Sequence, residues 1–361
     1  MKILHTESSV GWGGQELRVV ADALMAQNSG HTVKIVCDSN SKFFCRSQID
    51  LKMLIRRAIG KKSVYCLISI FKVLNAEKPD IVISHSSTDS WLVAICTILS
   101  RNSFFWIRVR HVSAKIKPNT LTKWLYRKPD VVVTTSEQIR DHVIEIAGLP
   151  LHRVVSIPTG IDTSRFVPRD TLTEKPIQRR DCFVVVMVAT LRSWKGHRYA
   201  IEAIADLPEV HLVIAGDGPQ YSALKQMTID YGVESRVEFA GHVEDVVSIY
   251  NSADCFLQPS TANEGVSQSV LQAMACELPV IVSDIGGLNE VVIDGVNGLL
   301  VNKEDSLAIK QALKTYMTSP ETMLDYGRRA RETAKQKYSI EIMRDKMATI
   351  YNLTAGRYDQ N

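Results

Sequence analysis

Residues 264–282, EGVSQSVLQAMACELPVIV, carry the clearest fold signal in the chain. Glu264 and Gly265 form a predicted turn, and the apolar side chains that follow recur at helical spacing over 266–275. Residues 278–282 are a continuous apolar run, which is typical of a strand buried on both faces. A turn, a helix and a buried strand in immediate succession favour an α/β protein with a parallel sheet.

Two places offer backbone N–H groups to an anion. The first turn of the predicted helix holds no acidic residue, so the N–H groups near Val266 and Ser267 are free to bind a phosphate. Glu264 lies directly before the first turn of this helix, where its carboxylate is suited to accept hydrogen bonds from sugar hydroxyls. In the motif GWGGQE near the start of the chain, Gly13 and Gly14 let the backbone approach a phosphate closely. We therefore expect an anionic, sugar-containing substrate.

Short β-branched apolar runs recur along the whole chain, with helix-like segments between most of them. This alternation predicts parallel sheets covered on both faces. The runs are residues 2–6, 32–37, 80–85, 104–111, 131–135, 183–190, 210–215, 237–240, 255–257 and 279–283. Beyond them, helices are predicted over 305–318, 321–337 and 340–355.

The chain length predicts more than one domain, since 361 residues exceed the ~250–300 at which a single core stops growing. The strand pattern pauses after Ile157 in a segment rich in Pro, Thr and charge. We predict two Rossmann-like, doubly wound domains facing each other across a deep cleft. The predicted parts are an N-terminal domain over 1–165, a linker over 166–182, a C-terminal domain over 183–338, and a C-terminal helix within 339–361 that can cross back to the N-terminal domain.

Composition points to a reducing, cytoplasmic environment. The seven cysteines include no C-x2-C pair, which argues against a disulfide framework and a zinc site. No run of 18 apolar residues and no secretory leader is present. Residues 1–165 carry 23 Lys and Arg against 13 Asp and Glu, whereas the remainder carries 20 against 26. The basic first half and acidic second half therefore face different partners.

Ligands of open α/β sheets bind beyond the carboxyl ends of the strands, so residues just after strands are candidate ligands. Arg192 and Lys195 follow the first strand of the second half and suit a diphosphate. Two cations in a loop are often only solvated, but their position after a buried strand favours the binding interpretation. Gly241 and His242 follow another strand and are candidates to line a nucleobase pocket.

The first half offers candidates for acceptor binding. His85 and His111 end their strands on the same side of one predicted sheet, which favours a site over two separately packed histidines. Arg108 and Arg110 alternate along the second of these strands, so they share a face and are expected to meet an anionic acceptor.

Seven segments in this order resemble the retaining glycosyltransferases of family 4, whose two Rossmann-like domains form the GT-B fold. They are GWGGQE, His111 at a strand end, SIPTGIDTSRF, LRSWKG, AGDGP, EGVSQSVLQAMACELPVIVSDIGG and NEVVIDGVNGLLV. Each segment is weak alone, but the ordered set is specific and spans almost the whole chain. The resemblance implies a nucleotide-sugar donor held mostly by the C-terminal domain and an acceptor held by the N-terminal one.

The resemblance also implies roles for individual residues. Arg192 and Lys195 would neutralise the departing diphosphate. The glycines of GWGGQE would approach the same diphosphate from the other domain. Glu264 would hold hydroxyls of the donor sugar, and His111 would lie near the sugar and the phosphate as the second catalytic residue. Attack by the acceptor hydroxyl on the face that the diphosphate leaves would retain the anomeric configuration. No metal and no other cofactor is then expected.

One residue departs from the family pattern. The second acid of the family's E-x7-E motif, which binds ribose hydroxyls, is Gln272 in this chain. A neutral amide loses the charge-assisted hydrogen bonds, which are about twice as strong as neutral ones. Weaker donor binding, an altered nucleotide preference and lost activity therefore stay open. Gln272 also supports one alternative to transfer, a nucleotide-sugar-binding protein with a weakened site. A nucleotide-sugar epimerase of similar two-domain shape is a second alternative.

The basic segment 46–78 suggests where an acceptor is found. Lys52, Arg56, Arg57, Lys61 and Lys62 lie among apolar residues, and a basic amphipathic helix of this kind can rest on an anionic membrane. An ordinary charged surface helix explains the pattern equally well. We expect a glycan acceptor, lipid-linked or part of a surface polysaccharide such as lipopolysaccharide, and peripheral contact with the inner face of the cytoplasmic membrane. Nucleic acid is not expected, because no base-reading motif accompanies the charge.

Overall fold

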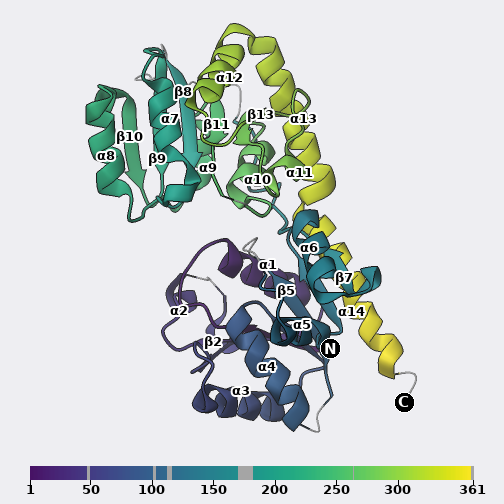
Figure 1. The fold of residues 1–361 in the computed structure, drawn as a ribbon. Coiled ribbons are helices and arrows are strands. Elements are labelled where there is room, and N and C mark those ends of the chain that lie inside the picture. Colours follow the sequence, from purple (N-terminus) through teal and green to yellow (C-terminus); the bar gives the residue numbers. More distant parts are fainter. Residues whose placement is uncertain (47–48, 101–102, 112–115, 170–181, 263, 359–361) are drawn as a thin grey trace. The chain divides into compact units, whose positions relative to one another are not determined.

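The computed structural model describes the chain except for residues 47–48, 101–102, 112–115, 170–181, 263 and 359–361. The chain forms two compact units. Unit 1 comprises Met1–Gly160 together with Ile340–Asn361, and unit 2 comprises Ile161–Ser339. Each unit is built on one parallel sheet with helices packed against it (Figure 1). The predicted pair of doubly wound α/β domains is confirmed.

Unit 1 contains a seven-stranded sheet in the order β3-β2-β1-β4-β5-β6-β7. Its strands are β1 (Lys2–Glu7), β2 (Thr32–Asp38), β3 (Leu54–Arg57), β4 (Ile81–Ser84), β5 (Phe105–Arg110), β6 (Val131–Thr134) and β7 (Val154–Ser156). Its helices are α1 (Gly14–Asn28), α2 (Phe43–Arg46), α3 (Val64–Glu77), α4 (Ser87–Leu99), α5 (Thr120–Arg127), α6 (Glu137–Ala147) and α14 (Ile340–Tyr358), with single turns at Leu51–Met53 and Leu151–Arg153.

Successive residues of these strands face opposite sides of the sheet, so each side has its own core. Ile3 and Ile83 pack with side chains of α1 and α14 on one side. Leu4 and Val82 pack with α3 and α4 on the other. The near-continuous apolar strands of the sequence are explained by this burial on both faces.

Unit 2 contains a six-stranded sheet in the order β10-β9-β8-β11-β12-β13. Its strands are β8 (Phe183–Val188), β9 (Val210–Ala215), β10 (Val237–Gly241), β11 (Cys255–Gln258), β12 (Val280–Ser283) and β13 (Leu299–Val301). Its helices are α7 (His197–Ile204), α8 (Tyr221–Asp230), α9 (Val246–Asn251), α10 (Gln268–Ala275), α11 (Leu288–Val291), α12 (Ser306–Thr318) and α13 (Pro320–Tyr338), with single turns at Ser193–Lys195 and Glu234–Arg236.

The boundary between the units differs from the predicted one. The structure divides the chain after Gly160, not after residue 165, because Ile161 and Phe166 are buried in the core of unit 2. These two apolar residues stand in a polar stretch, so the composition of the segment hides them. Most of the predicted linker lies outside the described residues. The C-terminal helix α14 belongs to unit 1, where it packs against α1.

The prediction of a basic amphipathic helix within 46–78 is wrong. Residues 54–57 form the edge strand β3, which pairs in parallel with β2, and the helix of this region begins only at Val64. Arg56 and Arg57 therefore lie on a strand, where Arg56 stacks on the ring of Phe44 at 3.8 Å. The pattern misled because a four-residue strand contains too few residues to distinguish the two periodicities. In the described part of the chain, no helix has the length and apolar character needed to cross a bilayer.

Candidate functional site

Both sheets reverse their strand order once, which places two loops of each unit at a switch point. In unit 2 the chain leaves β8 toward β9 on one side, and later returns to place β11 on the other side. The loops after the carboxyl ends of β8 and β11 therefore diverge, and such a crevice is where open α/β sheets bind ligands. Lys195 lies in the first of these loops and Glu264 in the second.

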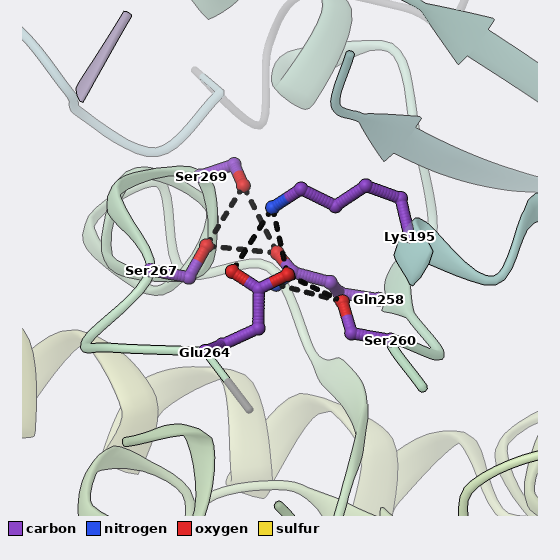
Figure 2. Close-up of polar contacts among 6 residues, drawn as sticks. All are labelled: Lys195, Gln258, Ser260, Glu264, Ser267 and Ser269. Carbon is purple, nitrogen blue, oxygen red and sulfur yellow. Dashed lines mark hydrogen bonds and ion pairs between the residues drawn. The ribbon is translucent and has the colours of Figure 1, made fainter. Parts of the chain in front are cut away.

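Lys195 and Glu264 form an ion pair at this switch point. The Nζ atom of Lys195 lies 2.8 Å from Oε1 and 3.0 Å from Oε2 of Glu264. Figure 2 shows the lysine reaching across from its own loop to the carboxylate. The side chains are 17% and 13% exposed, so both are largely withdrawn from water yet still open to a ligand. The structure thus brings together two residues that the sequence separates by 69 positions.

Close backbone approach holds the two loops together. Gly196 has a φ of +75°, and a Cβ atom added there would lie 1.7 Å from the carbonyl oxygen of Pro259. The N–H of Thr261 donates to the carbonyl oxygen of Trp194 at 2.8 Å. Only glycine permits this conformation and this proximity. The position of Lys195 is therefore fixed by the backbone of the loop after β11.

A second glycine contact fixes the backbone of Glu264. Gly286 has a φ of +55°, and a Cβ atom there would lie 2.3 Å from the carbonyl oxygen of Glu264. The N–H of the next residue, Gly287, donates to that same oxygen at 2.7 Å. The loop after β12 thus supports the carboxylate from behind.

Gln258, at the end of β11, is the centre of the hydrogen-bond network drawn in Figure 2. Its side chain is buried, and its Oε1 atom accepts from the hydroxyls of Ser267 at 2.8 Å and Ser269 at 3.0 Å. Its Nε2 atom donates to Ser260 Oγ at 3.4 Å, and Ser260 donates to Glu264 Oε1 at 2.9 Å. These hydrogen bonds connect the carboxylate to the start of α10.

The sequence analysis missed Gln258, Ser260 and Ser269. Gln258 is the last residue of β11 and Ser260 lies two residues later, so the rule that favours residues at and after strand ends would have selected them. Ser269 lies inside the predicted helix and carried no signal. Ser267 was expected for its backbone, and the structure adds a role for its hydroxyl.

The start of α10 has the features of an anion-binding helix end. The helix begins at Gln268, and the side chain of its N-cap residue Ser267 accepts no hydrogen bond from a backbone N–H of the first turn, since its hydroxyl is bonded to Gln258 and Ser269. The first turn contains no acidic residue. Backbone N–H groups near Val266 and Ser267 are thus suited to an anion at the positive end of the helix.

Gln272 projects from the same helix and has a defined partner. The Tyr250 hydroxyl, which is buried, donates to Gln272 Oε1 at 2.9 Å and lies 3.2 Å from the carbonyl oxygen of Ser269. This hydrogen bond fixes the orientation of the amide, whose nitrogen carries two further N–H donors. The neutral residue at this position is therefore integrated into the packing of unit 2.

Three further donor-site candidates lie in loops after strand ends of unit 2. Arg192 is exposed and shares the loop of Lys195, with its guanidinium 5.6 Å from the ring of Trp194. Gly241 ends β10, and His242 follows it at the surface. Because β8, β10 and β11 are parallel, all three candidates lie at the same sheet edge as the ion pair.

Unit 1 has its own cluster at its switch point, made of three histidines. His85 follows β4 and His111 follows β5, and Nδ1 of His85 lies 3.1 Å from Nε2 of His111. His5 on β1 extends the cluster, since its Nδ1 atom lies 2.9 Å from Nε2 of His85. The rings stack with centroids 5.2 and 5.3 Å apart. The predicted proximity of His85 and His111 is confirmed, whereas His5 was missed because it lies inside an apolar strand.

These histidines are neutral at physiological pH. Burial, and then the positive charge of Arg18, lower the pKa of His5 and His111 to about 3. Burial and the neighbouring rings lower the pKa of His85 well below its usual value. A neutral imidazole has one donor and one acceptor nitrogen, so each ring can act as either toward its neighbour. Among the described residues, no group of three or more His, Cys, Asp or Glu side chains is arranged to hold a metal ion.

The glycine motif of unit 1 borders a buried acid. Gly13 is the N-cap of α1 in an extended conformation, and Gly14 is its first residue. Glu7 accepts hydrogen bonds from the Ser9 N–H at 2.8 Å and the Gln15 amide at 2.6 Å. Burial, and then the charge of Asp89, raise the pKa of Glu7 to about 8. An uncharged Glu7 at neutral pH removes one source of repulsion toward an anion at this loop.

The acceptor prediction for Arg108 is wrong. Its side chain is buried, with the guanidinium 4.0 Å from the ring of Tyr126 on α5. Burial lowers the pKa of Arg108, so the enclosure is costly for its charge. Arg108 and Arg110 do alternate along β5 as predicted, but α5 covers Arg108. Arg110, at the end of the strand, is half-buried.

Glu7→Gln is expected to change how stability depends on pH. The folded chain holds the pKa of Glu7 at about 8, above its ordinary value of 4.5, so the free energy of unfolding falls as pH rises between these values. The Gln variant has no carboxyl group at this position, so its free energy of unfolding does not fall for this reason as pH rises. Its stability relative to wild type, measured by urea unfolding, should therefore be higher near pH 8 than near pH 5. An identical difference at both pH values would contradict a buried, protonated Glu7.

Two family models match successive parts of the chain. Residues 12–165 match Glycosyltransferase Family 4, and residues 169–333 match Glycosyl transferases group 1. The boundary between the two matches lies close to the boundary between units 1 and 2.

Similar proteins and structures are consistent with these matches. The putative glycosyltransferase EpsD of Bacillus subtilis is 31% identical over 241 residues, which cover 64% of this chain and 62% of EpsD. An Escherichia coli UDP-Gal:alpha-D-GlcNAc-diphosphoundecaprenol alpha-1,3-galactosyltransferase is 26% identical over 91% of this chain and 88% of its own length. Anabaena HepE, solved in complex with UDP, superposes with a TM-score of 0.83 at 20% identity, covering 98% of this chain and 100% of HepE. With two parallel-sheet domains of the GT-B type and both family models matched, this chain belongs to the family 4, group 1 glycosyltransferases.

Proposed function

We propose that this protein transfers a sugar from a nucleotide-sugar donor to a hydroxyl group of a glycan acceptor, with retention of the anomeric configuration. The observation that carries the proposal is the Lys195–Glu264 pair at the switch point of unit 2. A cation and a carboxylate side by side suit a ligand in which a phosphate adjoins a sugar hydroxyl. The N–H groups at the start of α10 lie on the same edge of the sheet and add donors for phosphate.

The chemistry depends on the departing diphosphate. As the bond between the anomeric carbon and the phosphate oxygen breaks, negative charge grows on that oxygen. Lys195 and Arg192 stabilise this charge, and we propose that they do so without a metal ion. The acceptor oxygen forms its bond to the anomeric carbon on the face that the phosphate leaves, and its proton passes to the leaving phosphate. Glu264 accepts hydrogen bonds from hydroxyls of the donor sugar.

His111 is proposed as the group of unit 1 that contacts the donor sugar and its phosphate. As a neutral imidazole it offers a hydrogen bond without adding charge. Arg110 remains proposed for the acceptor side, and Gly13 and Gly14 for the approach to the diphosphate. His85 is buried, with both ring nitrogens directed at His5 and His111, so a contact between His85 and the acceptor is no longer proposed. Gly241 and His242 are proposed for the base.

The donor is proposed to be a UDP-sugar. HepE was solved with UDP, and the Escherichia coli relative that matches 91% of this chain is named for UDP-Gal. The test is a thermal-shift screen against UDP-, GDP-, ADP- and dTDP-sugars, followed by a transfer assay with the donor that binds. Binding without transfer to any glycan would favour a sugar-binding protein with a weakened site, and conversion of the donor sugar without acceptor would favour an epimerase.

Gln272→Glu is expected to tighten donor binding. A carboxylate at this position would still accept from the Tyr250 hydroxyl, and it would form charge-assisted bonds to ribose hydroxyls. We expect Kd for the UDP-sugar to fall by roughly 3- to 30-fold, the equivalent of about 0.7–2 kcal/mol, measured by calorimetry. Gln272→Ala should raise Kd instead. Equal affinity in all three proteins would remove Gln272 from the donor site.

The acceptor is proposed to be a lipid-linked glycan reached at the membrane surface. The named substrate of the Escherichia coli relative is diphosphoundecaprenol-linked. In unit 1 the outward side of α3 exposes Val64, Tyr65 and Ile68 at 72%, 74% and 49%, and the exposed Lys61 and Lys62 precede them. Apolar side chains beside cations suit an anionic lipid surface.

Liposome co-sedimentation checks this surface. Replacing Val64 and Tyr65 by serine should weaken binding to anionic liposomes at low salt by about 10-fold or more, since each exposed apolar side chain would contribute up to ~1.5–3 kcal/mol on burial in the lipid. Leu307→Ser on α12, equally exposed at 74%, is the matched control and should bind as wild type does. Wild-type protein that ignores anionic liposomes would contradict membrane contact while leaving the transfer proposal intact.

A further inference from the structure

The histidine chain of unit 1 arises from the geometry of three adjacent strands. β1, β4 and β5 are neighbours in the sheet. Each histidine lies two residues after a member of the core cluster that faces α1 and α14, so the three side chains share that side of the sheet. The pairs are Ile3 and His5, Ile83 and His85, and Val109 and His111. Neighbouring strands are ~4.8 Å apart, which matches stacked imidazole rings.

Two hydrogen bonds in series couple the tautomers of the three rings. His85 uses both of its ring nitrogens, Nε2 toward His5 and Nδ1 toward His111. A neutral His85 has a single N–H, so it must donate to one neighbour and accept from the other. The three protons therefore have only two consistent arrangements, one with every N–H directed toward His111 and one with every N–H directed toward His5.

The far end of the chain distinguishes these arrangements. Nε2 of His5 is buried and has no hydrogen-bond partner among the described residues. It carries a lone pair in the first arrangement and an N–H in the second. The charged groups packed around the chain are Arg18 of α1, which pairs with Asp22 at 2.8 Å, and Asp89 of α4, which accepts from the His85 backbone N–H at 3.1 Å.

Arg18 favours the first arrangement. Arg18 is a buried residue of α1, and its Nη1 atom donates at 2.7 Å to the carbonyl oxygen of Ile157, which belongs to the same core cluster as Ile3 and Ile83. Its Nη2 atom lacks a partner among the described residues. The second arrangement would also bury an N–H of His5 without an acceptor, which is rarer in proteins than a buried acceptor without a donor. A lone pair is stabilised by a nearby cation, whereas an N–H bond directed at a cation is destabilised.

We propose that His5 and His85 are positioning residues that hold His111 as a neutral imidazole protonated on Nδ1, through a chain in which every N–H is directed toward His111. Nε2 of His111 accepts from His85, and Nδ1, the nitrogen outside the chain, is left to donate. The assignment of that N–H to a donor-sugar or phosphate oxygen rests on the proposed function. The tautomer itself is a property of the protein without substrate.

Long-range ¹H–¹⁵N spectra of the full-length protein labelled with ¹⁵N-histidine test the proposal without any substrate. Protonated and lone-pair nitrogens resonate in separate ranges, and single substitutions assign the nine histidines. We expect Nδ1–H and a lone pair on Nε2 in His5, His85 and His111, unchanged between pH 5.5 and 8. An Nε2–H on His111, or an imidazolium signal from any of the three in this range, would overturn it.

His85→Leu tests whether the chain does the positioning. Without His85, His111 loses its hydrogen-bond partner and should show a mixture of both tautomers. His142→Leu is the matched control, since His142 lies on α6 of the same unit, outside the histidine chain, and accepts from the Ile116 N–H at 3.3 Å. Its His111 signals should be those of wild type. A single Nδ1–H tautomer of His111 in folded His85→Leu protein would refute a positioning role.

Activity distinguishes failure of this inference from failure of the proposed function. If transfer occurs, His85→Leu should lower kcat by about 10-fold with little change in the KM for the donor, because a mixed tautomer reduces the competent fraction of enzyme. If wild-type protein transfers sugar but His111 lacks the Nδ1–H signal, the inference is refuted and the proposed function is not. If wild-type protein shows the Nδ1–H signal but transfers no sugar, the proposed function is refuted and the inference is not.

Discussion

Replacement of Glu264 by alanine is expected to lower kcat/KM for sugar transfer by about 10²-fold or more while the protein stays folded. The carboxylate holds Lys195 at 2.8 Å and accepts from Ser260 at 2.9 Å, and it is the acid placed to bind donor-sugar hydroxyls. Each hydrogen bond to a charged group contributes ~1.5–3 kcal/mol, so loss of one such bond corresponds to ~10- to 150-fold. Initial rates with varied donor, together with thermal unfolding, measure both parts of the expectation.

The matched variant is Lys195→Met, which removes the other half of the pair and keeps the length of the side chain. Loss of one cation that stabilises the leaving group should lower kcat by ~10²–10³-fold. The double variant should lose less than the sum of the two single effects, since the residues are in contact. Near-wild-type turnover in Glu264→Ala, or strictly additive losses, would show that the pair is not the centre of the site.

The second large effect is expected from Gly196→Ala, which changes no polar group. The new Cβ atom would lie 1.7 Å from the Pro259 carbonyl oxygen, so the loop that carries Lys195 must move away from β11. A displacement of ~1 Å in a positioned catalytic group can cost ~10²-fold in rate. We therefore expect a loss of at least that size in kcat/KM, together with a lower Tm. Steady-state rates and thermal denaturation provide both measurements.

Gly232→Ala separates the clash from the backbone strain. Gly232 also belongs to unit 2 and has a φ of +64°, but no atom lies within 4 Å of its would-be Cβ. The free energy of unfolding of this control should fall only by the strain of an alanine in the left-handed conformation, ~1–3 kcal/mol, and its activity should be unchanged. If both variants retained full activity, the close packing of the Lys195 loop on Pro259 would have no functional role.

The residues of the unit 2 site were predictable where they follow strands. Lys195 lies in the loop after β8 and Glu264 in the loop after β11, and the rule for open α/β sheets selects such positions. Their contact could not be derived, because it depends on how Gly196 and Gly286 pack against other loops. Ser269 was not predictable for the same reason, since its hydroxyl bonds to Gln258 through tertiary structure.

The fold was predictable where apolar runs were long and continuous. The strands around His5, Val82 and Val213 are buried on both faces and were identified from composition alone. Three of the four edge strands were not identified: β3 was taken for a helix, and β7 and β13, of three residues each, were missed. Arg108 shows what strand periodicity cannot predict. Periodicity places Arg108 and Arg110 on one face of β5, but it does not predict that α5 covers Arg108.

The assignment of α14 to unit 1 has a consequence for synthesis of the chain on the ribosome. Met343, Met347, Ile350 and Tyr351 of α14 complete the core beside α1, yet all of unit 2 is translated between β7 and this helix. At ~5–20 residues per second, the apolar surface that α14 covers stays open for roughly 10–40 s. We therefore expect the nascent first unit to expose this apolar surface to chaperones during this interval, whereas unit 2, which is continuous in sequence, can fold as soon as it emerges.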